Sequence, residues 1–280
     1  MALLAALVTV VLWASAFVGI RAAGEDLSPG ALSLGRLAVG SALLGVFVLA
    51  QRGRLPGRRE WPLLVVCGAL WFGLYNLALN EAERRVDAGT AAMLVNVGPI
   101  LIALLAGWLL REGFPRMLVV GCGVAFAGTI VIGLATSERG VSASWGAVLC
   151  VAAAALYAGG VVAQKPLLSR ASALHVTWAA CTIGLVVCLP FAPTLFDELG
   201  RADGSAIAWM VYLGAFPTAI GFMTWAFALS RTTAGRMGAT TYLVPPIAIL
   251  MGWGLLGETP EPLALVGGAL CLGGVVLTRR

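Results

Sequence analysis

The chain has 280 residues, of which 60% are hydrophobic and 11% are charged, and its formal net charge is +5. A soluble globular domain is about 45–50% apolar and about 25% charged, so this composition excludes an ordinary soluble protein. Apolar runs recur along the whole length, and about 20 apolar residues are enough to cross a bilayer as a helix. The composition therefore predicts an all-α integral membrane protein.

Charged residues and Pro/Gly clusters divide the apolar runs into ten predicted transmembrane helices. In chain order these are residues 3–20, 30–50, 61–80, 88–110, 116–135, 144–164, 173–191, 206–229, 234–256 and 262–278. The connections are short, and none is long enough to form a separate soluble domain. The first run lacks a basic n-region and a cleavage site, so we expect it to be a retained helix.

The basic residues are distributed unevenly between alternate connections. One set of loops and ends holds twelve Lys and Arg residues, whereas the other set holds five together with eleven of the thirteen carboxylates. Lys and Arg accumulate in cytoplasmic loops. We therefore expect both termini to lie in the cytoplasm.

Two segments half a chain apart resemble each other. Residues 89–113, "GTAAMLVNVGPILIALLAGWLLREG", align with residues 235–259, "GRMGATTYLVPPIAILMGWGLLGET", at an offset of 146. The Pro and the Glu that follow in each segment coincide, and the basic loop after the second span corresponds to an acidic loop after the seventh. Because five spans form one copy, the second copy enters the membrane in the opposite orientation. This predicts a five-plus-five inverted repeat with units at residues 1–136 and 144–280.

The ten spans, the repeat, "VLWASAFVGIRAA" in the first span and "VNVGPILIALLAGWLLREG" in the fourth resemble the drug/metabolite transporter superfamily. More narrowly, the chain resembles its EamA-type exporters, and most closely the YddG-type exporters of aromatic and other neutral amino acids. This resemblance implies a multi-pass carrier in a bacterial inner (plasma) membrane that exports small metabolites, often amino acids.

Arg36 lies inside the otherwise apolar second span. An ionisable residue within a membrane is costly and usually faces the bundle interior or a water-filled cavity. Its guanidinium is suited to a substrate carboxylate, which it binds through paired hydrogen bonds. The alternative is that Arg36 extends to the outer surface or pairs with a neighbouring carbonyl.

Aromatic and polar residues at helical spacing and at equivalent positions of the two repeats predict a central cavity. It would stack an apolar side chain and hydrogen-bond an amino-acid backbone. With Arg36, the candidate substrate-binding residues are Trp13, Tyr75, Asn76, Asn80, Asn96, Tyr157, Trp178, Trp225, Thr241 and Tyr242. The alternative for any single one is that it joins helices through hydrogen bonds.

Four prolines interrupt predicted helices: Pro99, Pro217, Pro245 and Pro246. Each removes a backbone donor and kinks the helix, which a membrane helix tolerates when neighbours satisfy the freed carbonyl. They are either gating hinges or plain kinks.

The central portions of the predicted spans contain no Asp or Glu, and the single histidine, His175, lies near the start of the seventh span. Proton-coupled carriers usually keep a titratable group at membrane depth, so the pattern favours facilitated uniport. A proton-coupled exporter of drugs or other small metabolites is the alternative. It would use Glu81, Glu83 or Asp87, which come close to the outer ends of two spans.

Other classes of function are disfavoured. A single histidine and the absence of HExxH argue against a metalloenzyme, and Ser15 has no evident base to activate it. Rings of like charge typical of a channel do not appear, and Arg36 alone within the spans is too few cations for a nucleotide sugar. We expect no enzyme activity, cofactor, metal or nucleic acid. The expected partners are a small-molecule substrate and the lipid bilayer, and the expected assembly is a monomer or homodimer.

Overall fold

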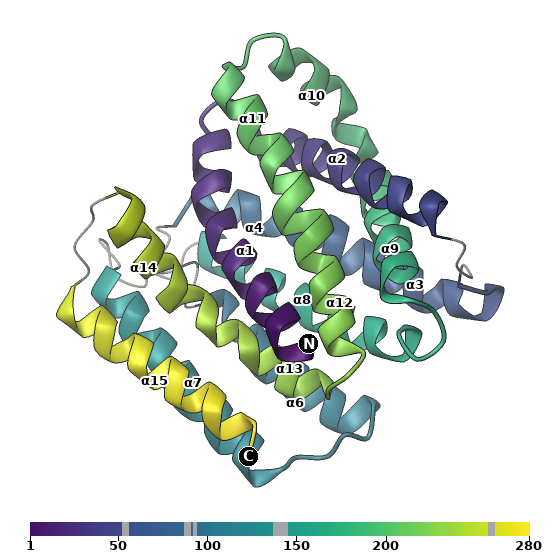
Figure 1. Cartoon of the computed structure of the whole chain (residues 1–280). Helices are drawn as coiled ribbons and strands as arrows, with labels where there is room; N and C mark the ends of the chain where they lie inside the picture. Colours follow the sequence, from purple (N-terminus) through teal and green to yellow (C-terminus); the bar gives the residue numbers. More distant parts are fainter. Residues whose placement is uncertain (52–55, 87–90, 92–93, 137–144, 257–260) are drawn as a thin grey trace.

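The protein is a bundle of helices in a computed structural model, which describes residues 1–51, 56–86, 91, 94–136, 145–256 and 261–280 (Figure 1). The earlier helices are α1 (Ala2–Ala23), α2 (Pro29–Ala50), α3 (Trp61–Cys67), α4 (Tyr75–Glu83), α6 (Gly98–Leu109) and α7 (Arg116–Thr136). The later helices are α8 (Trp145–Leu167), α9 (Ala173–Cys188), α10 (Ala192–Leu199), α11 (Gly204–Leu213), α12 (Phe222–Leu229), α13 (Ala234–Thr240), α14 (Val244–Leu256) and α15 (Pro262–Thr278). No described residue lies in a strand. The all-α prediction is therefore confirmed for the described part of the chain.

Seven helical segments among the described residues are long and apolar enough to cross a membrane. They are Ala2–Ala23, Pro29–Ala50, Arg58–Glu83, Arg116–Ala135, Trp145–Leu167, Ala173–Leu199 and Gly204–Leu229. Gly98–Leu109 and Pro262–Thr278 are shorter apolar helices. Residues 88–90, 92–93 and 144, which belong to predicted spans, lie outside the described residues, as do Asp87 and Glu258. The chain is thus a multi-pass membrane protein, and the ten-helix count stays a prediction.

Two predicted spans are interrupted near their middle. In 88–110, residues 96–97 form a turn before α6 begins, and in 234–256 a 3-10 segment, η5 (Thr241–Leu243), separates α13 from α14. Prolines cause both interruptions, because Pro99 and Pro245 lack the amide that a continuous helix needs and disfavour helical geometry in the residue before them. Each proline then sits in the first turn of the next helix, where no amide is required.

Two other spans contain a wider, π-helical segment. It is η2 (Gly68–Leu74) between α3 and α4, and η4 (Gly214–Gly221) between α11 and α12. Their first residues are 146 positions apart, the same offset as in the aligned segments. Short π-helical segments within α-helices are frequent at functional sites.

One end of the bundle is held by carboxylates, and we call it the acidic end. Here Glu198 Oε2 accepts the Ser28 amide at 2.8 Å, and Asp26 Oδ2 accepts the Asp203 amide at 2.9 Å. These contacts join the start of α2 to α10 and the α1–α2 connection to the start of α11, which lies at the top of Figure 1.

The opposite end, which we call the basic end, lies toward the chain's C-terminus at the bottom of Figure 1. Lys165 Nζ at the end of α8 donates to the carbonyls of Leu229 and Thr232, at 2.7 and 2.5 Å. Glu112 accepts the amides of Ala234 and Gly235, the first two residues of α13, at 2.8 and 3.3 Å. A carboxylate there satisfies amides that have no partner within the helix. The placement of this end in the cytoplasm stays a prediction.

Glycines let α7 and α15 approach closely along one flank, where Figure 1 shows them side by side. A Cβ on Gly128 would lie 2.5 Å from the Gly267 carbonyl oxygen, and one on Gly274 would lie 2.5 Å from the Ala125 amide nitrogen. Inside a membrane the hydrophobic effect does not drive helices together, so helix association depends on the close van der Waals packing that small residues allow. This pair supports the bundle away from its centre.

Gly128→Ala should lower the free energy of unfolding by about 1–3 kcal/mol, because the added methyl group meets backbone atoms that cannot yield. The measurement is the thermal midpoint of the detergent-purified protein. Gly123→Ala is the matched control on the same helix, since its Cβ would meet nothing within 4 Å. Equal midpoints for the two variants would contradict the packing assigned to this flank.

Candidate functional site

A cavity of about 80 Å³ lies at the centre of the bundle, between helices from both halves of the chain. It is lined by Trp13, Ala16, Phe17, Ile20, Arg36, Trp71, Tyr75, Asn76, Leu79, Val95, Asn96, Pro99, Tyr157, Phe222, Thr241 and Val244. Small-molecule sites are typically about 300–1,000 Å³. The cavity is therefore too small for a typical small-molecule ligand unless the surrounding helices separate.

Aromatic side chains form one part of the cavity wall, and Trp71 is the centre of this aromatic cluster. The ring centroid of Trp71 lies 4.9 Å from Phe222, 5.4 Å from Tyr157, 5.5 Å from Trp225 and 6.0 Å from Trp13. Such separations are typical of offset and edge-to-face aromatic pairs. The cluster offers a flat apolar surface on which the side chain of a ligand can stack.

Arg36 supplies positive charge at this cavity. Only 4% of the residue is exposed, and its Nε donates to Thr218 Oγ1 at 3.1 Å. Thr218 belongs to η4, so the π-helical segment positions the partner of the arginine. This burial favours the prediction that Arg36 faces the bundle interior over its extension to the outer surface. Arg36 is also among the residues that line the cavity.

Both interrupted spans contribute to the wall. Val95 and Thr241 line the cavity, and each precedes a proline by four residues. Because Pro99 and Pro245 have no amide, the carbonyls of Val95 and Thr241 have no α-helical partner. Irregular backbone at membrane depth is tolerated where it is buried in protein or lines a water-filled cavity.

The structure brings most of the predicted binding residues together. Those that line the cavity are Trp13, Arg36, Tyr75, Asn76, Asn96, Tyr157 and Thr241, and the predicted hinge Pro99 lines it too. Trp13 Nε1 also donates to the Pro217 carbonyl at 3.3 Å, which ties α1 to η4. Their roles in binding stay predictions.

Four predicted binding residues lie outside the wall. Trp225 is fully buried behind Trp13, with the two rings stacked at 5.0 Å. Tyr242 is fully buried in a separate apolar cluster with Val10 and Leu118. Trp178 on α9 packs beside Gly45 of α2, and Asn80 joins α4 to α2.

The remaining predicted hinges also lie away from the wall. Pro217 is inside η4, and Pro245 and Pro246 are in the first turn of α14. Hinge motion at these prolines stays a prediction.

Sequence reasoning missed Trp71 and Phe222, which form much of the aromatic surface. Both lie in apolar stretches where an aromatic residue normally packs against lipid or other helices. Their spacing could have identified them. Trp71 precedes Tyr75 by four residues, so the two share a helix face. Phe222 is the position equivalent to Asn76 at the repeat offset of 146. The wider turns of the two π-helical segments hid this spacing.

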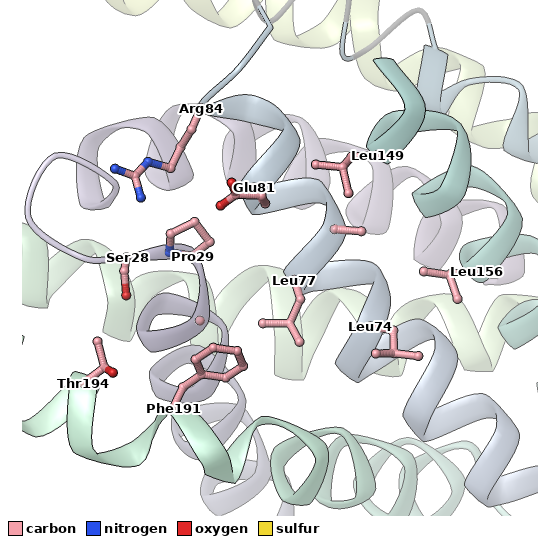
Figure 2. A pocket seen from close by; sticks show the side chains of 12 residues that line it. Ser28, Pro29, Leu74, Leu77, Glu81, Arg84, Leu149, Leu156, Phe191 and Thr194 are labelled. Atoms are coloured by element: carbon pink, nitrogen blue, oxygen red, sulfur yellow. The ribbon is translucent and has the colours of Figure 1, made fainter. Parts of the chain in front are cut away.

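A larger hollow, of about 660 Å³, lies on the other side of α4 (Figure 2). Its floor is apolar, with Leu77, Leu156 and Phe191, and Glu81 and Arg84 lie at its rim. Leu74 in its wall is 41% exposed, which identifies an open flank of the bundle rather than an enclosed site. One helix, α4, therefore separates this groove from the central cavity.

A bundle of membrane-length helices around a cavity bordered by interrupted spans is the architecture of a membrane transporter. The model of the EamA-like transporter family matches residues 1–134 and 144–280. The chain belongs to this family, as the resemblance to EamA-type exporters predicted. The family indicates a transporter rather than an enzyme.

Two relatives are named as exporters or efflux pumps. The chain is 39% identical over 277 residues to a probable terminal-alkyne amino-acid exporter of Streptantibioticus cattleyicolor, covering 99% of this chain and 92% of the relative. It is 24% identical to a probable amino-acid metabolite efflux pump of Salmonella typhimurium, with 97% and 92% coverage. A crystal structure at 22% identity superposes with a TM-score of 0.82 over 99% of this chain and 95% of that one, which shows a shared fold.

Thr218→Val should destabilise the protein more than Thr218→Ser, because valine keeps the shape but leaves the Arg36 Nε–H without its acceptor. Hydrogen bonds to charged groups contribute about 1.5–3 kcal/mol. The measurement is the thermal midpoint of each variant in detergent. If the valine and serine variants melt together, the Thr218 hydroxyl does not anchor Arg36.

Proposed function

We propose that this protein exports aromatic and other neutral amino acids across a bacterial inner membrane. The substrate's carboxylate binds Arg36 and its side chain stacks within the aromatic cluster. The observation that carries the proposal is the cavity itself, whose wall combines one buried guanidinium with aromatic rings, two asparagine amides and aliphatic side chains. Guanidinium pairs with carboxylate through two parallel hydrogen bonds, and aromatic rings bury an apolar side chain.

The amino-acid class is supported by two relatives named as exporters or efflux pumps of amino acids or their metabolites. The wall also argues against strongly anionic substrates, because Arg36 is the one basic residue among the described residues that line it. A nucleotide sugar would require several cations around its phosphates.

Alternating access follows from an inverted repeat of residues 1–136 and 144–280. The paired π-helical segments, the paired interruptions and the two family matches support this repeat. In such carriers the two halves rock around a fixed central site. Opening would require release of the Lys165 and Glu112 contacts at the basic end, or of the Glu198 and Asp26 contacts at the acidic end.

Transport is facilitated, so the amino-acid gradient sets the direction of net flux. Among the described residues that line the cavity there is no Asp, Glu or His, and proton relays at membrane depth usually use such groups. A described carboxylate on α4 toward the acidic end, Glu83, lies beyond the lining residues. The competing proposal, a proton-coupled exporter of drugs or other metabolites, predicts uphill flux when a pH gradient is imposed.

The first experiment is uptake of labelled phenylalanine, threonine and lysine into liposomes that contain the purified protein, with and without a pH gradient. We expect saturable flux of phenylalanine and threonine, little flux of lysine, and no accumulation driven by the gradient. Proton-driven accumulation would overturn facilitated transport. Absence of flux for every amino acid tested would overturn the proposed substrate class.

Arg36→Met should raise the half-saturating phenylalanine concentration by about tenfold or more, because a charge-assisted bond to the carboxylate is lost. Flux is measured across a range of phenylalanine concentrations at equal protein content. Arg84→Met is the matched control, since Arg84 lies at the rim of the outer groove. Equal curves for the two variants would exclude carboxylate binding by Arg36.

A further inference from the structure

Two buried oxygen atoms on α4 have no hydrogen-bond partner among the described residues: Asn80 Oδ1 and Glu83 Oε1. The orientation of the Asn80 amide is fixed, because its Nδ2 donates to Ser33 Oγ at 3.0 Å and toward the Pro29 carbonyl at 3.4 Å, and a carbonyl can only accept. Both orphaned atoms are therefore acceptors. Leaving a buried acceptor unpaired costs about 1–3 kcal/mol, and more for a charged group.

Helical geometry places Glu83 on the cavity side of α4, whereas Asn80 lies between α4 and α2. Asn76 and Leu79 line the cavity, and Glu83 lies between them in projection, almost two turns after Asn76 and one turn after Leu79. The axial distance from Leu79 to Glu83 is about 6 Å. Glu83 thus lies just beyond the lining residues, toward the acidic end of the bundle.

The same contact that orients Asn80 brings Arg36 and Glu83 into one neighbourhood. Ser33 is one turn from Arg36 on α2, and Asn80 is one turn from Glu83 on α4, so the Ser33–Asn80 bond joins the helices between the two charged residues. Arg21 and Arg36 both lie near enough to Glu83 to act on its charge, Arg21 more strongly than Arg36. None of the ion pairs in the described part of the chain involves Arg36 or Glu83.

We propose that Asn80 Oδ1 and Glu83 Oε1 bind the α-ammonium group of the substrate, while Arg36 binds its α-carboxylate. This inference rests on the proposed function and names the chemistry that its site selects, a zwitterion with both charges present. An ammonium group carries three donors and no acceptor, which matches two acceptors without partners. The neutral side chain then points into the aromatic cluster.

Other occupants satisfy these atoms less well. A proton on Glu83 would neutralise the carboxylate but leave Asn80 Oδ1 without a donor. A hard cation such as Ca²⁺ takes about six to eight oxygen ligands, whereas these are the two orphaned side-chain oxygens that α4 offers in the described structure. The ammonium group is the occupant that uses both.

The test compares phenylalanine with two analogues, 3-phenylpropionate, which lacks the ammonium group, and 2-phenylethylamine, which lacks the carboxylate. Each is added as a competitor of labelled phenylalanine flux into liposomes containing the full-length protein. In the wild type we expect both analogues to compete much more weakly than unlabelled phenylalanine. Glu83→Gln should raise the half-saturating phenylalanine concentration about 10- to 100-fold. It should leave competition by 3-phenylpropionate unchanged.

Glu81→Gln is the matched control, because Glu81 lies on the opposite face of α4, at the groove rim, where it pairs with Arg85. Glu83→Asp keeps the charge and should retain most of the preference for phenylalanine over 3-phenylpropionate. Thermal midpoints of all variants separate loss of binding from loss of folding.

Three outcomes would overturn the inference. One is that Glu83→Gln keeps the wild-type preference for phenylalanine over 3-phenylpropionate. Another is that Glu81→Gln loses it equally. The third is that Glu83→Gln abolishes flux driven by a pH gradient while phenylalanine still binds as in the wild type, which would make Glu83 a proton carrier. Failure of the wild type to transport any amino acid would instead count against the proposed function.

Discussion

Inside a bilayer no water is available to the backbone, so each unpaired amide or carbonyl costs several kcal/mol, and most of the chain must be helical. The interruptions at residues 96–97 and Thr241–Leu243 are therefore the most informative part of this fold. They are tolerated because protein surrounds them and the cavity borders them. A proline two residues after the end of each interruption withholds the amide that would close the helix, so the sequence itself prevents a regular span at both places.

The same constraint governs charge. A buried guanidinium such as that of Arg36 is stable only where protein groups or a polar cavity replace its water, and here Thr218 satisfies one of its donors. The acceptors Asn80 Oδ1 and Glu83 Oε1 lie one turn apart on α4, and neither has a hydrogen-bond donor in the described part of the chain. Buried acceptors without donors lower the free energy of unfolding of the protein. A zwitterionic ligand would return that cost as binding free energy, which ties substrate choice to the energetics of the fold.

The helices are held together by different kinds of contact at the α7–α15 flank and at the two ends of the bundle. The flank of α7 and α15 is held by backbone contacts at glycines, which allow little adjustment. The two ends are held instead by single side chains, such as Lys165 on the carbonyls beyond α12 and Glu112 on the amides of α13. Such contacts can be exchanged for water near the membrane surface at modest cost. A small cavity between two exchangeable ends suits a carrier that opens to one side at a time.

The sequence by itself determined the membrane class, most span positions, the family and the wall residues Trp13, Arg36 and Tyr157, because hydrophobic run length and the cost of buried polar groups are local properties. It did not determine that Trp71 and Phe222 form the aromatic surface, since π-helical segments alter the helical register without a clear sequence signal. Nor did it show which predicted polar residues face the cavity. Only the tertiary structure decided that, because the facing of each helix depends on how its neighbours pack around it.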